Sequence, residues 1–308
     1  MRTNHERCFV IEGYLQNGGT YMAYQLGRIC HENLKLQVII AGTRRPWTPY
    51  FNYPYKFPAM SVAQMEREIE DQDLLICNPS FSSHLFGLRL PSKKLCYVQH
   101  VTTYQVLDTF FDQYVFVSNF VREFAAKYYG IDGPVINAFI HIDLFGGGLP
   151  WAKRKDSVMV LFHKEISQPL LEQVKLLYDK KYPSAPIVFD TYQRITQAEL
   201  AKAMGTHKYY LSLTPMEGFG LPALEAMASG CAVIGFDAWG GRDYFRHNMN
   251  AAVTQYPRLE TVADLLHEAI HEPEKTRQLA ENARADAQIF NQQRFDSSWL
   301  PILEKLLS

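Results

Sequence analysis

The sequence has little of several features that would place it outside the cytoplasm or in a membrane. Its five cysteines are scattered, odd in number and without the spacing of metal ligands or of a disulfide framework, so we expect reduced core thiols. No apolar run approaches the ~18 residues of a membrane span. The opening stretch MRTNHERCFVIEG has no signal-peptide pattern. These absences predict a cytoplasmic protein without a transmembrane segment.

An excess of charge of either sign is also missing. The 31 Lys and Arg residues nearly balance the 32 Asp and Glu residues, which leaves no basic stripe of the kind that binds nucleic acid. We therefore expect no nucleic-acid partner. A chain of 308 residues is long enough for two domains, each with its own core.

What is present is an alternation of short apolar runs with segments of helical periodicity. This alternation predicts an α/β fold with parallel sheets. The run GGGLP at 146–150 has linker chemistry, so we predict domains at 1–147 and 148–290 and a final helical segment at 291–308. The predicted strands are 8–11, 36–41, 73–77, 94–98 and 114–117, then 157–162, 186–190, 209–214, 231–236 and 250–254.

The most informative stretch is 214–241, TPMEGFGLPALEAMASGCAVIGFDAWGG. Pro222 suits a first helical position and Gly230 the residue just past a helix end, so a short helix is predicted between them. The turn before it presents free backbone N–H groups to an anion, and the carboxylates of Glu217 and Glu225 can accept hydrogen bonds from sugar or ribose hydroxyls. The alternative is a tight turn whose acid is favoured by the helix dipole.

Glu217 and Glu225 stand as E-x7-E in EGFGLPALEAMASG, which resembles the donor-site signature of the family-four retaining glycosyltransferases. The resemblance implies the GT-B architecture, two Rossmann-like domains facing each other across a cleft, with a C-terminal helix that packs back on the first domain. It also implies that Glu217 holds hydroxyls of the transferred sugar and Glu225 the ribose. The remaining donor-binding residues of this stretch would be Gly218, Phe219, Gly220 and Leu221.

In the first domain, a loop with Gly18 and Gly19 follows the first strand. Its spacing is not G-x-G-x-x-G, so a plain turn is an equal alternative, but the resemblance implies a paired glycine close to the donor diphosphate. His100 follows the strand at 94–98, where open α/β sheets bind ligands. The resemblance implies contact with the transferred sugar, whereas the alternative is a histidine that caps the strand end; His84 is a weaker competitor.

The second domain departs from the family pattern after its first strand. There the family has an arginine and, a few residues on, a lysine on the donor phosphates, whereas this chain has His163-Lys164-Glu165-Ile166. Lys164 can replace the arginine as a point charge but not as a bidentate fork. The position of the second cation holds Leu170. Arg194 could compensate or simply face solvent.

Two other motifs have ordinary interpretations. Asp71-Gln72-Asp73 has the D-x-D form of metal-dependent transferases with another fold. Because it precedes a buried strand, we interpret it as a solvated helix end and predict no metal site. The run RPWTPYFNYPYKF at 45–57 is rich in rings and proline. It suits either a loop that its aromatics hold on the domain surface or a stacking surface for a ligand.

The sequence therefore predicts a retaining glycosyltransferase that moves a sugar from a nucleotide diphosphate sugar to a hydroxyl acceptor, with no metal and no cofactor. Glu217 and His100 are the predicted catalytic residues, and Lys164 is added to the donor-binding set. Two alternative functions remain. The missing Arg/Lys pair favours a non-catalytic subunit that binds a sugar nucleotide, and a sugar-nucleotide epimerase would share the same fold. Peripheral membrane contact stays open, and the oligomeric state is not predicted.

Overall fold

The computed structural model describes residues 7–12, 17–42, 51–162 and 164–308. It divides the chain into two compact units. The first unit comprises Met1–Ala138 and Gln293–Ser308, and the second comprises Phe139–Gln292. The division thus lies before the predicted position after residue 147. The reason is local, since α5 (Ile142–Phe145) buries Phe145 and packs on helices α7 and α8 of the second unit.

The first unit contains a six-stranded parallel sheet. Its strand order is β3-β2-β1-β4-β5-β6, so the chain leaves β1 on one side and returns on the other at β4. The inner strands are buried along nearly their whole length, which explains their uninterrupted apolar sequences. The strands are β1 (Arg7–Ile11), β2 (Gln37–Ala41), β3 (Ala59–Met60), β4 (Leu74–Cys77), β5 (Lys93–Val98) and β6 (Gln113–Phe116).

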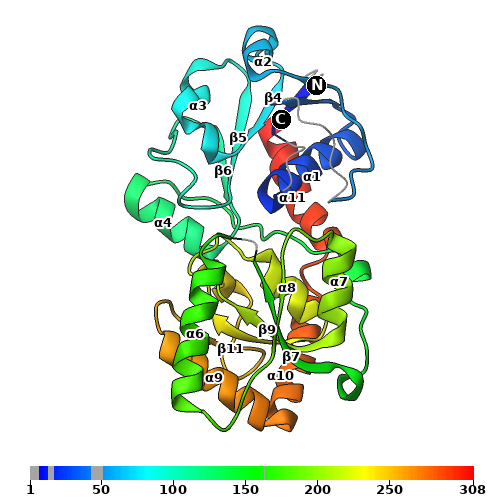
Figure 1. The fold of residues 1–308 in the computed structure, drawn as a ribbon. Helices are drawn as coiled ribbons and strands as arrows, with labels where there is room; N and C mark the ends of the chain where they lie inside the picture. The colour runs from blue at the N-terminus through cyan, green and yellow to red at the C-terminus, as the bar shows by residue number, and fades with distance from the viewer. Residues whose placement is uncertain (1–6, 13–16, 43–50, 163) are drawn as a thin grey trace. The chain divides into compact units, whose positions relative to one another are not determined.

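Helices α1 (Gly18–Glu32), α2 (Val62–Glu68) and α3 (Phe86–Arg89) lie between these strands in the chain, and α4 (Asn119–Tyr129) follows β6. The last helix, α11 (Gln292–Leu307), completes the unit and lies beside α1 (Figure 1). Its Trp299 is fully buried with the ring edge-on to Tyr97, 4.9 Å between centroids, and Asp296 accepts a hydrogen bond from Arg28 of α1 at 2.5 Å. The C-terminal segment therefore belongs to the core of the first unit.

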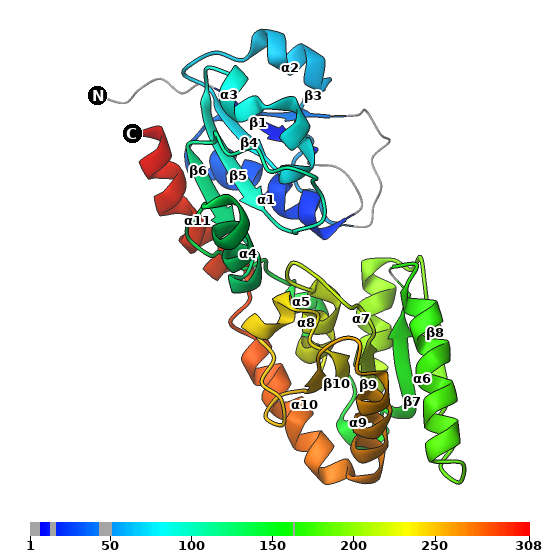
Figure 2. The same ribbon diagram turned by 90° about the vertical axis from the view of Figure 1, so that its left-hand side faces the viewer.

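The second unit contains a five-stranded parallel sheet in the order β11-β10-β9-β7-β8, which can be followed across Figure 2 from β10 to β8. The strands are β7 (Lys155–Leu161), β8 (Phe189–Tyr192), β9 (His207–Ser212), β10 (Ala232–Phe236) and β11 (Ala252–Thr254). The helices are α6 (Ser167–Lys181), α7 (Gln197–Thr206), α8 (Leu221–Ala228), α9 (Leu259–His271) and α10 (Pro273–Ala287).

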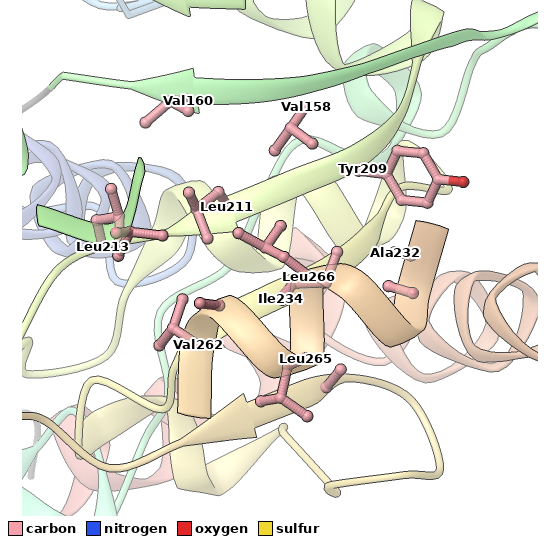
Figure 3. Close-up of a cluster of buried hydrophobic side chains, with 14 of the residues drawn as sticks. Val158, Val160, Tyr209, Leu211, Leu213, Ala232, Ile234, Val262, Leu265 and Leu266 are labelled. Atoms are coloured by element: carbon pink, nitrogen blue, oxygen red, sulfur yellow. The ribbon is translucent and has the colours of Figure 1, made fainter. Parts of the chain in front are cut away.

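One core of this unit lies between the sheet and the helices α6 and α9. Val158 and Val160 of β7 and Leu211 of β9 face Val262 and Leu266 of α9 in Figure 3. All of these side chains are essentially inaccessible to solvent. Burial of this area removes apolar surface from water and holds β7 and β9 side by side.

The predicted strand at 186–190 is displaced in the structure, where β8 begins at Phe189. Pro186 lacks the N–H that a ladder requires, and β8 is an edge strand that is only partly buried, so the apolar signal there is weak.

Among the described residues, no helix has both the length and the hydropathy of a membrane span.

Candidate functional site

The order of strands in the second unit creates a switch point between β7 and β9. The chain leaves these neighbouring strands toward β8 and β10 on opposite sides, so their carboxyl ends leave a crevice of the kind where open α/β sheets bind ligands. Lys164 follows β7, and Glu217 follows β9. Both predicted site residues of these loops therefore lie at the switch point.

The structure brings Lys164 and Glu217 into contact. Lys164 Nζ lies 2.9 Å from Glu217 Oε1 and donates a hydrogen bond to the carbonyl oxygen of Met216 at 3.3 Å. The Lys164 side chain is 36% exposed and that of Glu217 is 18% exposed, so the pair is accessible to a ligand. An incoming diphosphate would have to compete with Glu217 for the ammonium group.

Two other cations of this unit, Lys175 and Arg194, do not join this pair. Lys175 Nζ lies 3.1 Å from Glu172 on the same helix, α6, and stands over the ring of Phe189. Arg194 is exposed in the loop before α7. Of these three cations, Lys164 is the one that lies beside Glu217.

Helix α8 begins at Leu221, one residue before the predicted first position, so Pro222 is its second residue, and Gly230 lies past its end at φ +79° as predicted. Gly220 is the N-cap and has φ +92°, and a Cβ there would lie 2.9 Å from the hydroxyl of Tyr244. No side chain caps this end, so the first backbone N–H groups of α8 are placed to bind an anion.

The other residues of the E-G-F-G-L turn differ in their roles. Gly218 is buried, and the ring of Phe219 is buried against Tyr244 and Phe290 at centroid distances of 5.3 and 5.7 Å. The Phe219 side chain therefore anchors the turn, and only its backbone is suited to ligand contact. Leu221 is partly exposed at the first position of α8.

Glu225 lies in an environment unlike that of Glu217. Its side chain is buried within α8, and this burial raises the pKa of its carboxyl to about 8, against a hydrogen bond with Gln197 of α7 that lowers it. At neutral pH the Glu225 carboxyl is therefore mostly protonated. A hydroxyl ligand would meet a neutral acid that becomes a better acceptor on losing its proton.

Arg154 fixes the other end of α8, a role that the sequence does not signal. The buried guanidinium donates to the carbonyl oxygens of Ser229 and Gly230 at 2.7 and 2.8 Å, to that of His207 at 3.2 Å and to that of Leu149 at 2.7 Å. A cation here opposes the negative end of the helix dipole. Burial lowers the pKa of Arg154.

A second unpredicted element is the segment after β10, residues 237–242, which we call the 237–242 turn. The Glu217 N–H donates to the Ala238 carbonyl at 2.8 Å, and the Gly240 N–H donates to the Glu217 carbonyl at 3.2 Å. These two bonds make Glu217 and Trp239 partners in a parallel bridge. The backbone of Glu217 is thus fixed by the 237–242 turn.

In the first unit, the structure places Gly18 and Gly19 at the start of α1, where Asn17 caps the helix. Residues 13–16 of the same loop lie outside the described residues. A Cβ on Gly19 would lie 2.3 Å from Gln99 Oε1, so this helix start touches the segment just after β5. The predicted glycine pair and Gln99-His100 therefore lie together.

His100 has a defined tautomer in this arrangement. Its Nδ1 accepts a hydrogen bond from the Thr102 N–H at 3.1 Å, so the neutral ring carries its proton on Nε2. Thr102 Oγ1 lies 2.8 Å from the same nitrogen. The competitor His84 lies 3.4 Å from Glu66 of α2.

The D-x-D sequence has a structural role. Asp71 is exposed, but the interpretation as a solvated helix end is wrong for Asp73, which is fully buried and accepts hydrogen bonds from Arg7 Nε and Nη2 at 3.0 and 2.6 Å. It also accepts from the Glu70 N–H at 2.8 Å. Across the described ranges, no group of three or more His, Cys, Asp and Glu side chains could hold a metal ion.

The described part of the aromatic run, from Phe51 onward, packs on α1. Phe51 stacks on Tyr21 with centroids 4.3 Å apart, and Tyr53 meets Tyr24 edge-on at 4.8 Å. For these residues the interpretation as a loop held on the domain by its rings is confirmed. Residues 45–50 lie outside the described residues.

Comparison with known proteins gives a family match in the second unit. Residues 169–286, which include α8, match the family model of glycosyl transferases group 1. Over 91 residues the chain is 32% identical to an alpha-1,6-glucosyltransferase of Actinobacillus pleuropneumoniae serotype 7 (strain AP76). That match covers 29% of this chain and 28% of the relative, so the chain matches less than a third of the relative's length.

Solved structures resemble the chain over nearly all of its length. A glycosyltransferase from Rickettsia africae ESF-5 superposes with a TM-score of 0.78 at 15% identity, covering 99% of both chains. Anabaena Alr3699/HepE in complex with UDP and glucose superposes with a TM-score of 0.73 at 14% identity, covering 98% of this chain and 100% of the other. This likeness shows the fold, which is α/β with the GT-B architecture.

Proposed function

We propose that the chain is a retaining glycosyltransferase that moves a sugar from a nucleotide diphosphate sugar to a hydroxyl acceptor, without metal or cofactor. The observation that carries the proposal is the contact between Lys164 and Glu217 beside the uncapped start of α8. It joins a cation, a hydroxyl acceptor and free backbone amides at one switch point. The family match over residues 169–286 and the glucosyltransferase relative support it.

The proposed chemistry uses each group for one task. The bond between the anomeric carbon and the diphosphate oxygen breaks, and charge builds on the leaving diphosphate. Lys164 and the first amides of α8 stabilise that charge, and Gly18 and Gly19 are proposed to add backbone contacts. The acceptor oxygen bonds to the anomeric carbon on the same face of the ring, and its proton passes to the leaving phosphate oxygen.

The sugar and the nucleoside need acceptors and donors of other kinds. Glu217 accepts hydrogen bonds from hydroxyls of the transferred sugar, and Glu225 accepts from the ribose after losing its proton. His100, with its proton on Nε2, is proposed to donate to the transferred sugar. We further propose that the protein acts in the cytoplasm, in accordance with its described cysteines, which are all buried and free.

The experiment combines binding with turnover. Thermal shift with UDP-, GDP- and dTDP-sugars identifies the donor, because only ligands of the folded state raise the melting temperature. UDP-glucose is tested first, since a relative in structure was solved with UDP and glucose. Transfer of labelled sugar to an acceptor supports the proposal, and absence of stabilisation by every sugar nucleotide would refute it.

A binding-only subunit is the second candidate, because Lys164 is already paired with Glu217, and Lys175 is paired with Glu172 instead of joining it. Tight donor binding without transfer or hydrolysis in the presence of any acceptor would favour that role. An epimerase would instead convert the free sugar nucleotide without an acceptor, and chromatography of the nucleotide products distinguishes it.

A further inference from the structure

The 237–242 turn holds two consecutive non-glycine residues in the left-handed region of backbone conformation. Ala238 has φ +52°, and Trp239 has φ +62° with ψ −63°. The Gly240 N–H donates to the Ala238 carbonyl at 2.8 Å, which closes a three-residue turn around Trp239. This is the γ-turn with positive φ, which is rare and strained, and glycine is the residue that adopts such a conformation at least cost.

The strain is fixed in place by the neighbouring loop. Glu217 binds the turn through its N–H and its carbonyl, as described above. A Cβ on Gly240 would lie 2.2 Å from the carbonyl oxygen of Gly218, so the two backbones are in direct contact. The turn cannot relax without displacing the loop that carries Glu217. A strained residue that its surroundings hold firmly points to a role for its side chain.

Two side chains of the turn hold Trp239. Asp237 accepts hydrogen bonds from the backbone N–H of Trp239 at 3.2 Å and from Arg242 Nε at 2.7 Å. The guanidinium carbon of Arg242 lies over the Trp239 ring, 4.1 Å from its centroid. The ring of Trp239 is partly exposed, whereas Asp237 is buried. The backbone of Trp239 is thus fixed beside that of Glu217 at the carboxyl edge of the sheet, and its partly exposed ring has Arg242 over one face.

We propose that Trp239 is a sugar-binding residue, whose indole packs on the apolar face of the transferred hexose while Glu217 accepts hydrogen bonds from its hydroxyls. The inference rests on the proposed function and adds a residue to its sugar subsite. Small-molecule sites typically combine aromatic side chains with a small number of polar groups that point at the ligand. A residue whose backbone is already fixed loses less conformational entropy on binding.

The test uses paired variants at one position. Trp239→Ala and Trp239→Gly both remove the indole, but only glycine relieves the strain, and Trp239→Tyr keeps an aromatic face. Titration calorimetry with UDP-glucose and UDP gives the affinities, and thermal unfolding gives the stabilities. Trp151→Ala is the matched control, because Trp151 also has a cation over its ring, Lys208 at 5.9 Å, but precedes β7 at the opposite edge of the sheet.

We expect both truncations to weaken UDP-glucose binding about tenfold and the Tyr variant to retain most of it, with UDP binding changed by less than about twofold. The Gly variant should melt above the Ala variant, the reverse of the usual order. Trp151→Ala should leave both affinities unchanged. Equal losses for UDP and UDP-glucose, or unchanged UDP-glucose binding in both truncations, would overturn the inference while leaving the proposed function standing. Failure of the proposed function is distinct, since the wild type would then bind no sugar nucleotide and the inference would fall with it.

Discussion

Replacement of Lys164 by alanine is the most direct probe of the candidate site. The variant removes the ammonium group that lies 2.9 Å from Glu217 and 3.3 Å from the Met216 carbonyl. In the empty protein it therefore breaks an ion pair, and in the complex it removes the proposed contact with the diphosphate. The two effects have opposite signs for ligand binding, because the ion pair must be given up when the diphosphate binds.

The structure sets the expected size of the net effect. A hydrogen bond between a charged group and the diphosphate contributes ~1.5–3 kcal/mol. The partly exposed pair with Glu217 contributes at most ~1 kcal/mol, and this is lost on binding. Lys164→Ala should therefore weaken UDP binding by about 0.5–3 kcal/mol, or roughly 2–150-fold. Uridine has no phosphate, so its affinity should not change.

Titration calorimetry of UDP and uridine into the wild type and the variant measures these differences. Glu217→Gln is the matched companion, because it frees Lys164 from its partner; it should bind UDP as tightly as the wild type or up to about fivefold more tightly. Equal losses for UDP and uridine in Lys164→Ala, or no loss for either, would refute the reasoning. Weaker UDP binding in Glu217→Gln would show that the carboxylate does not compete for the cation.

Three further predictions concern the same site. Glu217→Gln should lower kcat/KM for sugar transfer at least tenfold, or about 1.4 kcal/mol. The melting temperature should change little, because Glu217 is a partly exposed loop residue. Wild-type kinetics in this variant would exclude Glu217 from the sugar subsite. The pKa of Glu225 is about 8 in the folded state and about 4.3 in the unfolded chain, so the folded state binds the extra proton and the free energy of unfolding falls as pH rises through this range. Denaturant titrations should therefore show that Glu225→Gln loses about 2–3 kcal/mol less stability between pH 6 and 9 than the wild type. Parallel pH profiles for the two proteins would contradict this. EDTA should leave transfer activity intact, because the proposed diphosphate contacts are amides and Lys164, and loss restored by Mn²⁺ or Mg²⁺ would count against the metal-free mechanism.

The sequence predicts those parts of the site that depend on local backbone chemistry. Pro222 and Gly230 bound α8 to within one residue of the prediction, because a helix start tolerates a missing N–H and a helix end favours left-handed glycine. Ser118 caps α4 by accepting a hydrogen bond from the Val121 N–H, and serine at an N-cap is a signal of the same local kind. Such signals involve residues only a few positions apart, so a single sequence is enough to show them.

The remaining features depend on contacts that sequence patterns do not record. Arg154 reaches Ser229 and Gly230, some 75 residues away, through their carbonyl oxygens, which every residue type provides. The γ-turn at Trp239 has no signature, because glycine normally marks positive φ and here stands one position later. The contact between Lys164 and Glu217 joins two loops that are far apart in the sequence, and the strand order, not a local pattern, brings them together.

The two-part composition of the first unit has a consequence for the order in which the chain folds. The second unit is continuous from Phe139 to Gln292, so it can complete its core as soon as those residues have left the ribosome. The first unit is synthesised earlier but requires Trp299, which packs against Tyr97, and Asp296, which binds Arg28. Until residues 293–308 are made, an apolar face of the nascent first unit stays uncovered. Of the two units, the first is therefore the later to finish folding, and during that interval its uncovered face can bind chaperones.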